Sequence, residues 1–378
     1  MTFFGVKTGR FILITSLAVM SFLTKADLIF EENFDGQPDF TSTMHTLSNT
    51  QRLSQGAIVP DNWDNIYQGT RWSPETGFPD NHASFEILAA NADKTRIGTG
   101  KSMVNWRESY NAGWNNFASD SQLQVLLGQE YNELYMEFWI SFSANWAGRT
   151  FEIGGQSKLA RMGYYNGVGD PFNGAPPSNP ALGPVLFWDY SQNTYGQRNN
   201  FAFRGGPPGY NYNMDPAAAG FEAGTNFTTK TIGKAVGGGN PMVLDQVRGG
   251  YLADVDRYDF IFHNQLWGAA GHWTKVGLYV KMNSAPGVND GLMMQWINDQ
   301  RIKVDTTVPW IGANPENKMV GWNFISLGGN DFFRPYPNED RFEDWYALDD
   351  VVVLTSIPED LLAETPSAPN APLDIRVQ

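Results

Sequence analysis

Every second residue from 134 to 142 is apolar, and this alternation restricts the possible fold more than any other feature of the sequence. The apolar residues are Leu134, Met136, Phe138, Ile140 and Phe142. A repeat of two residues is typical of a β-strand that turns one face toward a core. The same repeat returns at 276–282, so the sequence predicts at least two half-buried strands.

Three more segments add to the expected secondary structure. Residues 291–296 and 301–304 flank the turn-forming pair Asn298-Asp299, which predicts a β-hairpin. Residues 349–354 predict a closing strand. Leucines at helical spacing predict one short helix over 121–127. Strands therefore dominate the expected structure, and helices are scarce.

The composition narrows the fold class further. The chain has 39 glycines and 22 prolines without a regular period, which indicates many turns and excludes collagen. Apolar residues make up 42% and charged residues only 17%, which excludes a disordered chain or a coiled coil. Because cysteine is absent, disulfides, thiol nucleophiles and Cys-ligated metals are excluded. We expect an all-β fold: a single large β-sandwich of the jelly-roll type, with long loops such as 166–184.

The N-terminal segment is typical of a secretory signal peptide. Lys7 and Arg10 precede an apolar run over 11–23. That run is too short to cross a bilayer core of about 30 Å, so we expect a secreted or periplasmic protein, and a membrane anchor is the alternative. The expected organisation is a signal peptide at 1–26, one jelly-roll domain at 27–360 and a Pro-rich tail or linker at 361–378.

The net charge bears on the class of partner. It is -14 for the whole chain, and removal of 1–26 takes away three cations and no acid, which gives -14 - 3 = -17. Nucleic-acid binding depends on a basic face, so no nucleic-acid partner is expected. No membrane span is expected in the mature protein, because no stretch after the signal peptide is apolar over a sufficient length. A locally basic cleft on an acidic protein still suits an acidic polysaccharide. We expect a monomer.

Familiar catalytic motifs are missing from the sequence. It contains no Gly-x-Ser-x-Gly elbow, P-loop or His-Glu-x-x-His motif. Asp254 and Asp256, with Asp259 nearby, indicate a solvated turn or a structural calcium site more than a catalytic pair. We therefore predict no required cofactor and no catalytic metal, and structural calcium stays open.

Basic and aromatic residues are concentrated between 154 and 212. Segment 154–163 contains two glycines, Lys158 and Arg161, and segment 198–206 contains Arg198 and Arg204. Tyr-Asn-Tyr follows at 210–212. Because alternate residues of a strand share a face, cations and tyrosines spaced by two are expected to project together.

These residues carry a resemblance to a known family. A Gly-Gly pair before Lys158-Leu159, a strand with Arg204 and a Tyr-x-Tyr pair resemble polysaccharide lyases with a concanavalin-like jelly roll, especially family 14, the alginate and glucuronan lyase-like enzymes. The run 273–299 and the segment 325–330 also resemble that superfamily. The similarity covers residues 138–354.

The chain departs from the family pattern at four places, one of which is the short interval between Arg204 and the Tyr-x-Tyr pair. Gln156 and Ser157 stand between the glycine pair and Lys158, and the family's Pro-Gly after Lys-Leu is here Ala160-Arg161. The segment 202–204 lacks the serine of the family's Ser-x-Arg.

The resemblance implies a secreted lyase that cleaves an acidic, uronate-containing polysaccharide such as alginate by β-elimination. The expected catalytic residues are Lys158, Arg204, Tyr210 and Tyr212. The expected substrate-binding residues are Gln156, Arg198, Asn200, Arg107, Trp188 and His263. Lys158 or a tyrosinate is the candidate base, and a tyrosine such as Tyr212 is the candidate acid.

Alternatives remain at this point. Arg107 forms either a cleft pair with Glu108 or a cross-strand ion pair, and His263 is either a base or a structural residue. A noncatalytic carbohydrate-binding or adhesion module on the same sandwich would not bring Lys158, Arg204 and the tyrosines into one cleft. A glycoside hydrolase would need two carboxylates about 5–10 Å apart.

Overall fold

The computed structural model describes ten stretches of the chain. They are residues 26–42, 60–68, 82–108, 117–144, 155–168, 183–193, 196–204, 271–308, 310–333 and 343–362. The predicted signal peptide lies outside these stretches except for its last residue, and so does the predicted tail after residue 362. Within the ten stretches, no helix has the length and apolar character needed to cross a membrane.

The larger of two sheets has nine strands, and every pairing in it is antiparallel. Its order is β13-β12-β11-β7-β15-β5-β4-β2, and β1 also pairs with β15. The strands are β1 (Leu28–Glu32), β2 (Phe40–Thr41), β4 (Phe85–Ile87), β5 (Met103–Glu108), β7 (Glu133–Phe142), β11 (Thr274–Lys281), β12 (Gly291–Ile297), β13 (Gln300–Val308) and β15 (Glu343–Leu354).

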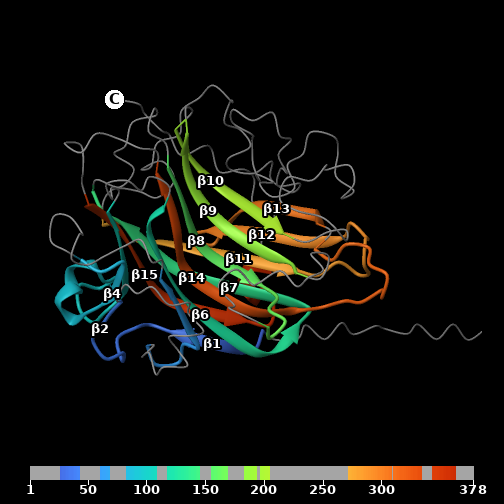
Figure 1. Ribbon diagram of the computed structural model, residues 1–378, viewed down its shortest axis with the longest axis horizontal. Helices are drawn as coiled ribbons and strands as arrows, with labels where there is room; N and C mark the ends of the chain where they lie inside the picture. The colour runs from blue at the N-terminus through green and yellow to red at the C-terminus, as the bar shows by residue number, and fades with distance from the viewer. Residues whose placement is uncertain are drawn as a thin grey trace, which may run out of the picture.

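The smaller sheet has six antiparallel strands in the order β10-β9-β8-β14-β6-β3. They are β3 (Asn65–Gln68), β6 (Phe117–Tyr131), β8 (Gly155–Gly163), β9 (Val185–Asn193), β10 (Gly196–Arg204) and β14 (Trp322–Phe333). The described helices are short: the 3-10 helix η1 (Ala89–Lys94) and α3 (Glu359–Leu362). The two sheets lie one over the other (Figure 1).

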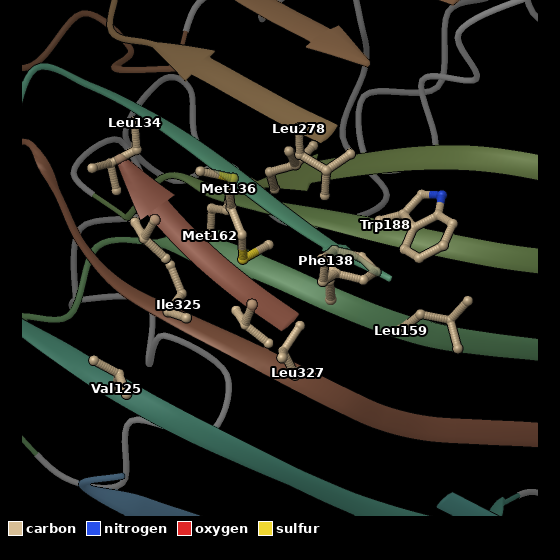
Figure 2. Close-up of a cluster of buried hydrophobic side chains, with 14 of the residues drawn as sticks. Val125, Leu134, Met136, Phe138, Leu159, Met162, Trp188, Leu278, Ile325 and Leu327 are labelled. Carbon is tan, nitrogen blue, oxygen red and sulfur yellow. The ribbon is translucent and has the colours of Figure 1, made fainter. Parts of the chain in front are cut away.

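The main core lies between the sheets. Figure 2 shows side chains of β7 and β11 facing side chains of β6, β8, β9 and β14. Leu134, Met136, Phe138 and Ile140 are fully buried in this core, as their alternation predicts. The expected all-β sandwich is thus confirmed, because each sheet turns one apolar face toward the other.

The predicted hairpin is confirmed as β12 and β13. Asn298 and Asp299 connect the strands with φ angles of 48° and 66°. Two consecutive residues with positive φ suit the right-handed twist of a two-residue hairpin, and Asn and Asp tolerate that conformation better than most residues. The predicted closing strand is also present, as the second half of β15.

The short helix expected over 121–127 is wrong, because this segment is the middle of β6. Leu123 and Val125 are buried in the core, whereas Gln122 and Gln124 alternate with them and lie on the opposite face of the sheet. The strand is held by β14 on one side and by β3 on the other. The alternation of polar and apolar residues therefore predicts the secondary structure of this segment correctly, whereas the helical spacing of its leucines does not.

Candidate functional site

A row of polar residues crosses the smaller sheet on the face turned away from the core. Register places Asn65 beside Gln124, Gln124 beside Ser326, and Ser326 beside Arg161. We call Asn65, Gln124, Ser326 and Arg161 the polar row. Its members are buried, with at most 2% of their surface exposed. Core residues such as Val125 alternate with the row, so the strand repeat fixes the face on which it lies.

Hydrogen bonds order the amide groups on this face. Nδ2 of Asn65 donates to Oε1 of Gln124 over 2.7 Å. Nη1 of Arg161 donates to Oε1 of Gln122 over 2.5 Å. Gln122 is fully buried, and it lies two residues before Gln124 on β6. Because its partner in this bond is a neutral amide, the Arg161 guanidinium is not neutralised by that contact.

Phe187 brings the two cations of β8 together. The central carbon of the Arg161 guanidinium lies 5.3 Å from the centre of the Phe187 ring, and Nζ of Lys158 lies 6.0 Å from the same point. Both distances are in the range of cation–π contacts. Lys158 is partly exposed, whereas Arg161 is 1% exposed. The Lys158 side chain therefore reaches the surface in part, whereas the Arg161 guanidinium is covered.

Four more of the predicted site residues occupy positions on this face. Gln156 on β8 and Arg198 on β10 both pair with Ser191 on β9. Asn200 on β10 pairs with Asp189. Position 204 pairs with 185. These partners are spaced by two from Phe187, so they belong to its face of the sheet. The register therefore places the positions of Gln156, Arg198, Asn200 and Arg204 on the same face as Lys158, with the partner of position 204 four residues away along β9 from the partner of Lys158.

Two predicted substrate-binding residues lie elsewhere. Trp188 is fully buried between the sheets, with its ring centre 5.5 Å from that of Phe138. It follows Phe187 on β9 and so points to the opposite face, which is the physical reason for this difference from the prediction. Arg107 belongs to the larger sheet and forms the cross-strand ion pair that was the alternative for it, with Asp344 as the partner.

Several predicted residues lie outside the described stretches. Tyr210, Tyr212 and His263 are among them, and so are Asp254, Asp256 and Asp259. Their roles stay predictions. In the stretches that are described, no three acidic or histidine side chains form a group able to hold a metal ion.

Sequence reasoning missed the polar row and Gln122. The signal was present, because Gln122 and Gln124 alternate with apolar residues, but the leucine spacing drew that segment toward a helix. Arg161 is one of the basic residues of segment 154–163, but it is not among the expected site residues. It stands three residues from Lys158, and an odd spacing predicts opposite faces of a regular strand.

The chemistry of this face suits an anion. A guanidinium, an ammonium and amide donors are the groups that bind a carboxylate, and their electrostatic effect is largest where water is excluded. Phe187 adds an apolar ring beside them. The face therefore carries the kinds of group that bind a carboxylate, and Lys158 is the partly exposed one among its described cations.

Comparisons with known proteins gave matches among solved structures alone. No family model matches the sequence, and no curated protein matches it. A double mutant of the alginate lyase Aly36B in complex with an alginate trisaccharide is similar over 87% of this chain and 97% of its own, with 13% identity and a TM-score of 0.42.

Two further structures have organisms attached to them. An endo-β-1,4-glucuronan lyase from the fungus Trichoderma reesei is similar over 78% of this chain and 92% of its own, with 12% identity and a TM-score of 0.42. A PL-14 alginate lyase from Aplysia kurodai is similar over 88% of this chain and 100% of its own, with 10% identity and a TM-score of 0.42.

Proposed function

We propose that the chain is a secreted polysaccharide lyase that cleaves an acidic, uronate-containing polysaccharide such as alginate by β-elimination. The observation that carries the proposal is the pair of cations around Phe187, one partly exposed and one buried on a neutral amide. The predicted signal peptide at 1–26 accords with action on an extracellular polymer.

β-Elimination makes a specific demand on a protein. A base removes the proton from the carbon next to the uronate carboxylate, and the electron pair of that bond forms a carbon–carbon double bond. The bond to the linking oxygen breaks, and an acid gives that oxygen a proton. Negative charge builds up on the carboxylate during the first step, so positive charge and hydrogen-bond donors placed there lower the barrier.

These demands suggest roles for residues on the outer face of the smaller sheet. Lys158 is the proposed base, because it carries the partly exposed amine of the site. Arg161 supplies buried positive charge beneath the carboxylate, and Arg204 is proposed to bind that carboxylate directly. Tyr212 is retained as the proposed acid for the leaving oxygen.

The test follows the conjugated double bond that elimination leaves in its product. Purified protein is incubated with alginate, glucuronan, ulvan or glycosaminoglycans, and the ultraviolet absorbance of that bond is recorded. We expect absorbance to rise with one polymer and to stop rising in Lys158→Met. The matched control is Lys281→Met, because Lys281 lies on the larger sheet and pairs with Glu133.

The other outcomes identify the alternatives. If absorbance stays flat while the protein is retained on a polymer affinity gel, the chain is a carbohydrate-binding module. If reducing ends appear without absorbance, the reaction is hydrolysis. Activity in Lys158→Met equal to that of the wild type would remove Lys158 as the base.

A further inference from the structure

The regular pairing of three strands is interrupted at Lys158. Between β8 and β9 the pairs Lys158–Asp189 and Ala160–Trp188 follow each other, so β8 has one extra residue, Leu159. This is the arrangement of a β-bulge, in which two residues of one strand face one residue of the next.

β14 is irregular at the same place. Leu327 pairs with Ala160, and the next pair is Asp331 with Ser157, so three residues of β14 span the space of two on β8. The first of these three, Gly328, has a φ of 77°, which favours glycine. The interruption thus extends across the seam between the two strands.

The bulge determines which side chains share a face. Lys158 and Arg161 are three residues apart, and a regular strand would turn them to opposite faces. One extra residue between them restores the same face, and both cations reach the Phe187 ring, at 6.0 and 5.3 Å from its centre. Without the bulge, Lys158 and Arg161 would lie on opposite faces of the smaller sheet.

Gly329 lies against the bulge and has no room for a side chain. A Cβ built on it would lie 1.5 Å from the carbonyl oxygen of Lys158 and 2.6 Å from its carbonyl carbon. It would also lie 3.2 Å from the Lys158 Cβ. The first two atoms are backbone, so a side chain at 329 must move β8 or β14 at Lys158.

We propose that Gly329 is a positioning residue for Lys158. The absent side chain lets β14 approach the backbone of Lys158, and this approach holds the bulge that turns the ammonium toward Phe187 and Arg161. The proposal rests on the proposed function, since Lys158 acts there as the base. It assigns the sequence Gly328-Gly329 to the chemistry of the site.

The test is Gly329→Ala, examined by kinetics and by crystallography. We expect kcat to fall by about 10²-fold with KM unchanged, because a displacement of about 1 Å at a reacting group has an effect of this size. The crystal structure is expected to show Nζ of Lys158 away from the Phe187 ring.

The matched control is Gly163→Ala at the same seam. Gly163 on β8 pairs with Phe324 on β14, and a Cβ there would lie 2.4 Å from the Phe324 ring. This substitution strains the seam five residues away from Lys158, so stability is expected to fall while kcat stays as in the wild type. Gly328→Ala places a side chain at a φ of 77°, a conformation that favours glycine. It is expected to fold and to lower kcat by less than Gly329→Ala.

Two results would overturn the proposal. One is a Lys158 ammonium that stays over Phe187 in the crystal structure of Gly329→Ala. The other applies if Gly329→Ala does not fold. In that case, a kcat of Gly328→Ala equal to that of Gly163→Ala would overturn the proposal. If the wild type performs no elimination, the proposed function fails by itself, and the crystal structure still decides whether Gly329 positions Lys158.

Discussion

Two buried arginines, one in each sheet, have opposite surroundings. Arg107 is 4% exposed and Arg161 is 1% exposed. Nε and Nη2 of Arg107 donate to the two carboxylate oxygens of Asp344 over 2.7 and 2.6 Å. Arg161 instead donates to the amide oxygen of Gln122 and lies over an aromatic ring.

The difference lies in the group that accepts the hydrogen bonds, a carboxylate for Arg107 and a neutral amide for Arg161. The two-pronged bond of Arg107 cancels its charge within the larger sheet. Two further cations also form ion pairs with carboxylates. Nη2 of Arg96 lies 2.8 Å from Oδ2 of Asp350, and Nζ of Lys275 lies 2.5 Å from Oδ1 of Asp299. The group that accepts the hydrogen bond from Arg161 is a neutral amide, so this contact leaves the charge of the guanidinium as it is.

Asp344→Asn removes the cancelling charge from Arg107 and has the largest expected effect. The free energy of unfolding is expected to fall by about 3–5 kcal/mol, because a buried charge loses its partner. Urea unfolding measures this loss. The control is Asp350→Asn on the same strand, whose pair with Arg96 is about one-third exposed and is worth about 1 kcal/mol or less. Equal losses in the two variants would contradict the assignment.

Asp349 is a buried acid of the larger sheet, and its neighbours include other acids. Burial raises the pKa of Asp349 from 3.8 to about 7, and the charges of Asp350 and Asp35 add to the rise. The folded state therefore holds this proton more tightly than the unfolded state. The stability that Asp349 contributes is fully present below pH 3.8 and is lost as the pH rises through 7.

Asp349→Asn removes this pH dependence. The free energy of unfolding of the variant, relative to the wild type, is expected to rise between pH 4 and pH 7, by about 4 kcal/mol at most. Thermal unfolding of both proteins across that range measures the difference. A difference that stays constant with pH would show that Asp349 ionises alike in both states.

Gln122→Glu makes the surroundings of Arg161 like those of Arg107. The carboxylate cancels the guanidinium charge, so kcat/KM on the polymer is expected to fall by about 10²-fold. The free energy of unfolding is not expected to fall, because a carboxylate accepts the Arg161 hydrogen bond at least as well as an amide. Steady-state kinetics and urea unfolding give the two readings.

Gln122→Met provides the contrast to this variant. It removes the acceptor but adds no charge, so it is expected to be less stable than Gln122→Glu and more active. If Gln122→Glu keeps the wild-type kcat/KM, the charge of Arg161 has no part in the reaction.

The predictable part of the fold is the part governed by local pattern. Alternation over 134–142 and the pair Asn298-Asp299 act within a few residues, and both predictions are confirmed. The pairing of Arg107 with Asp344 joins residues 237 apart in sequence, and only the register of β5 with β15 brings them together. The local pattern is therefore compatible with an ion pair at Arg107 but does not identify Asp344 as the partner.

The candidate site was predictable only in outline. Spacing by two indicated that the positions of Arg198, Asn200 and Arg204 share a face, and the register agrees. The position of Arg161 on this face was not predictable from its spacing, because Leu159 adds one residue to β8. A bulge reverses the face of every residue that follows it in the strand. Whether a strand has a bulge depends on its neighbour, which here is the glycine pair of β14.

The pairing of β1 with β15 has a consequence for the order in which the molecule is built. Residues Asp27 and Thr355, joined by hydrogen bonds at the end of this pair, are 328 positions apart in sequence. β15 also lies between β7 and β5, so a strand in the middle of the larger sheet is the last of the described strands to be synthesised. Until then β7 and β5 each have an unpaired edge. Folding of this sheet is therefore expected to be slow, because its central strand closes contacts between residues 328 positions apart.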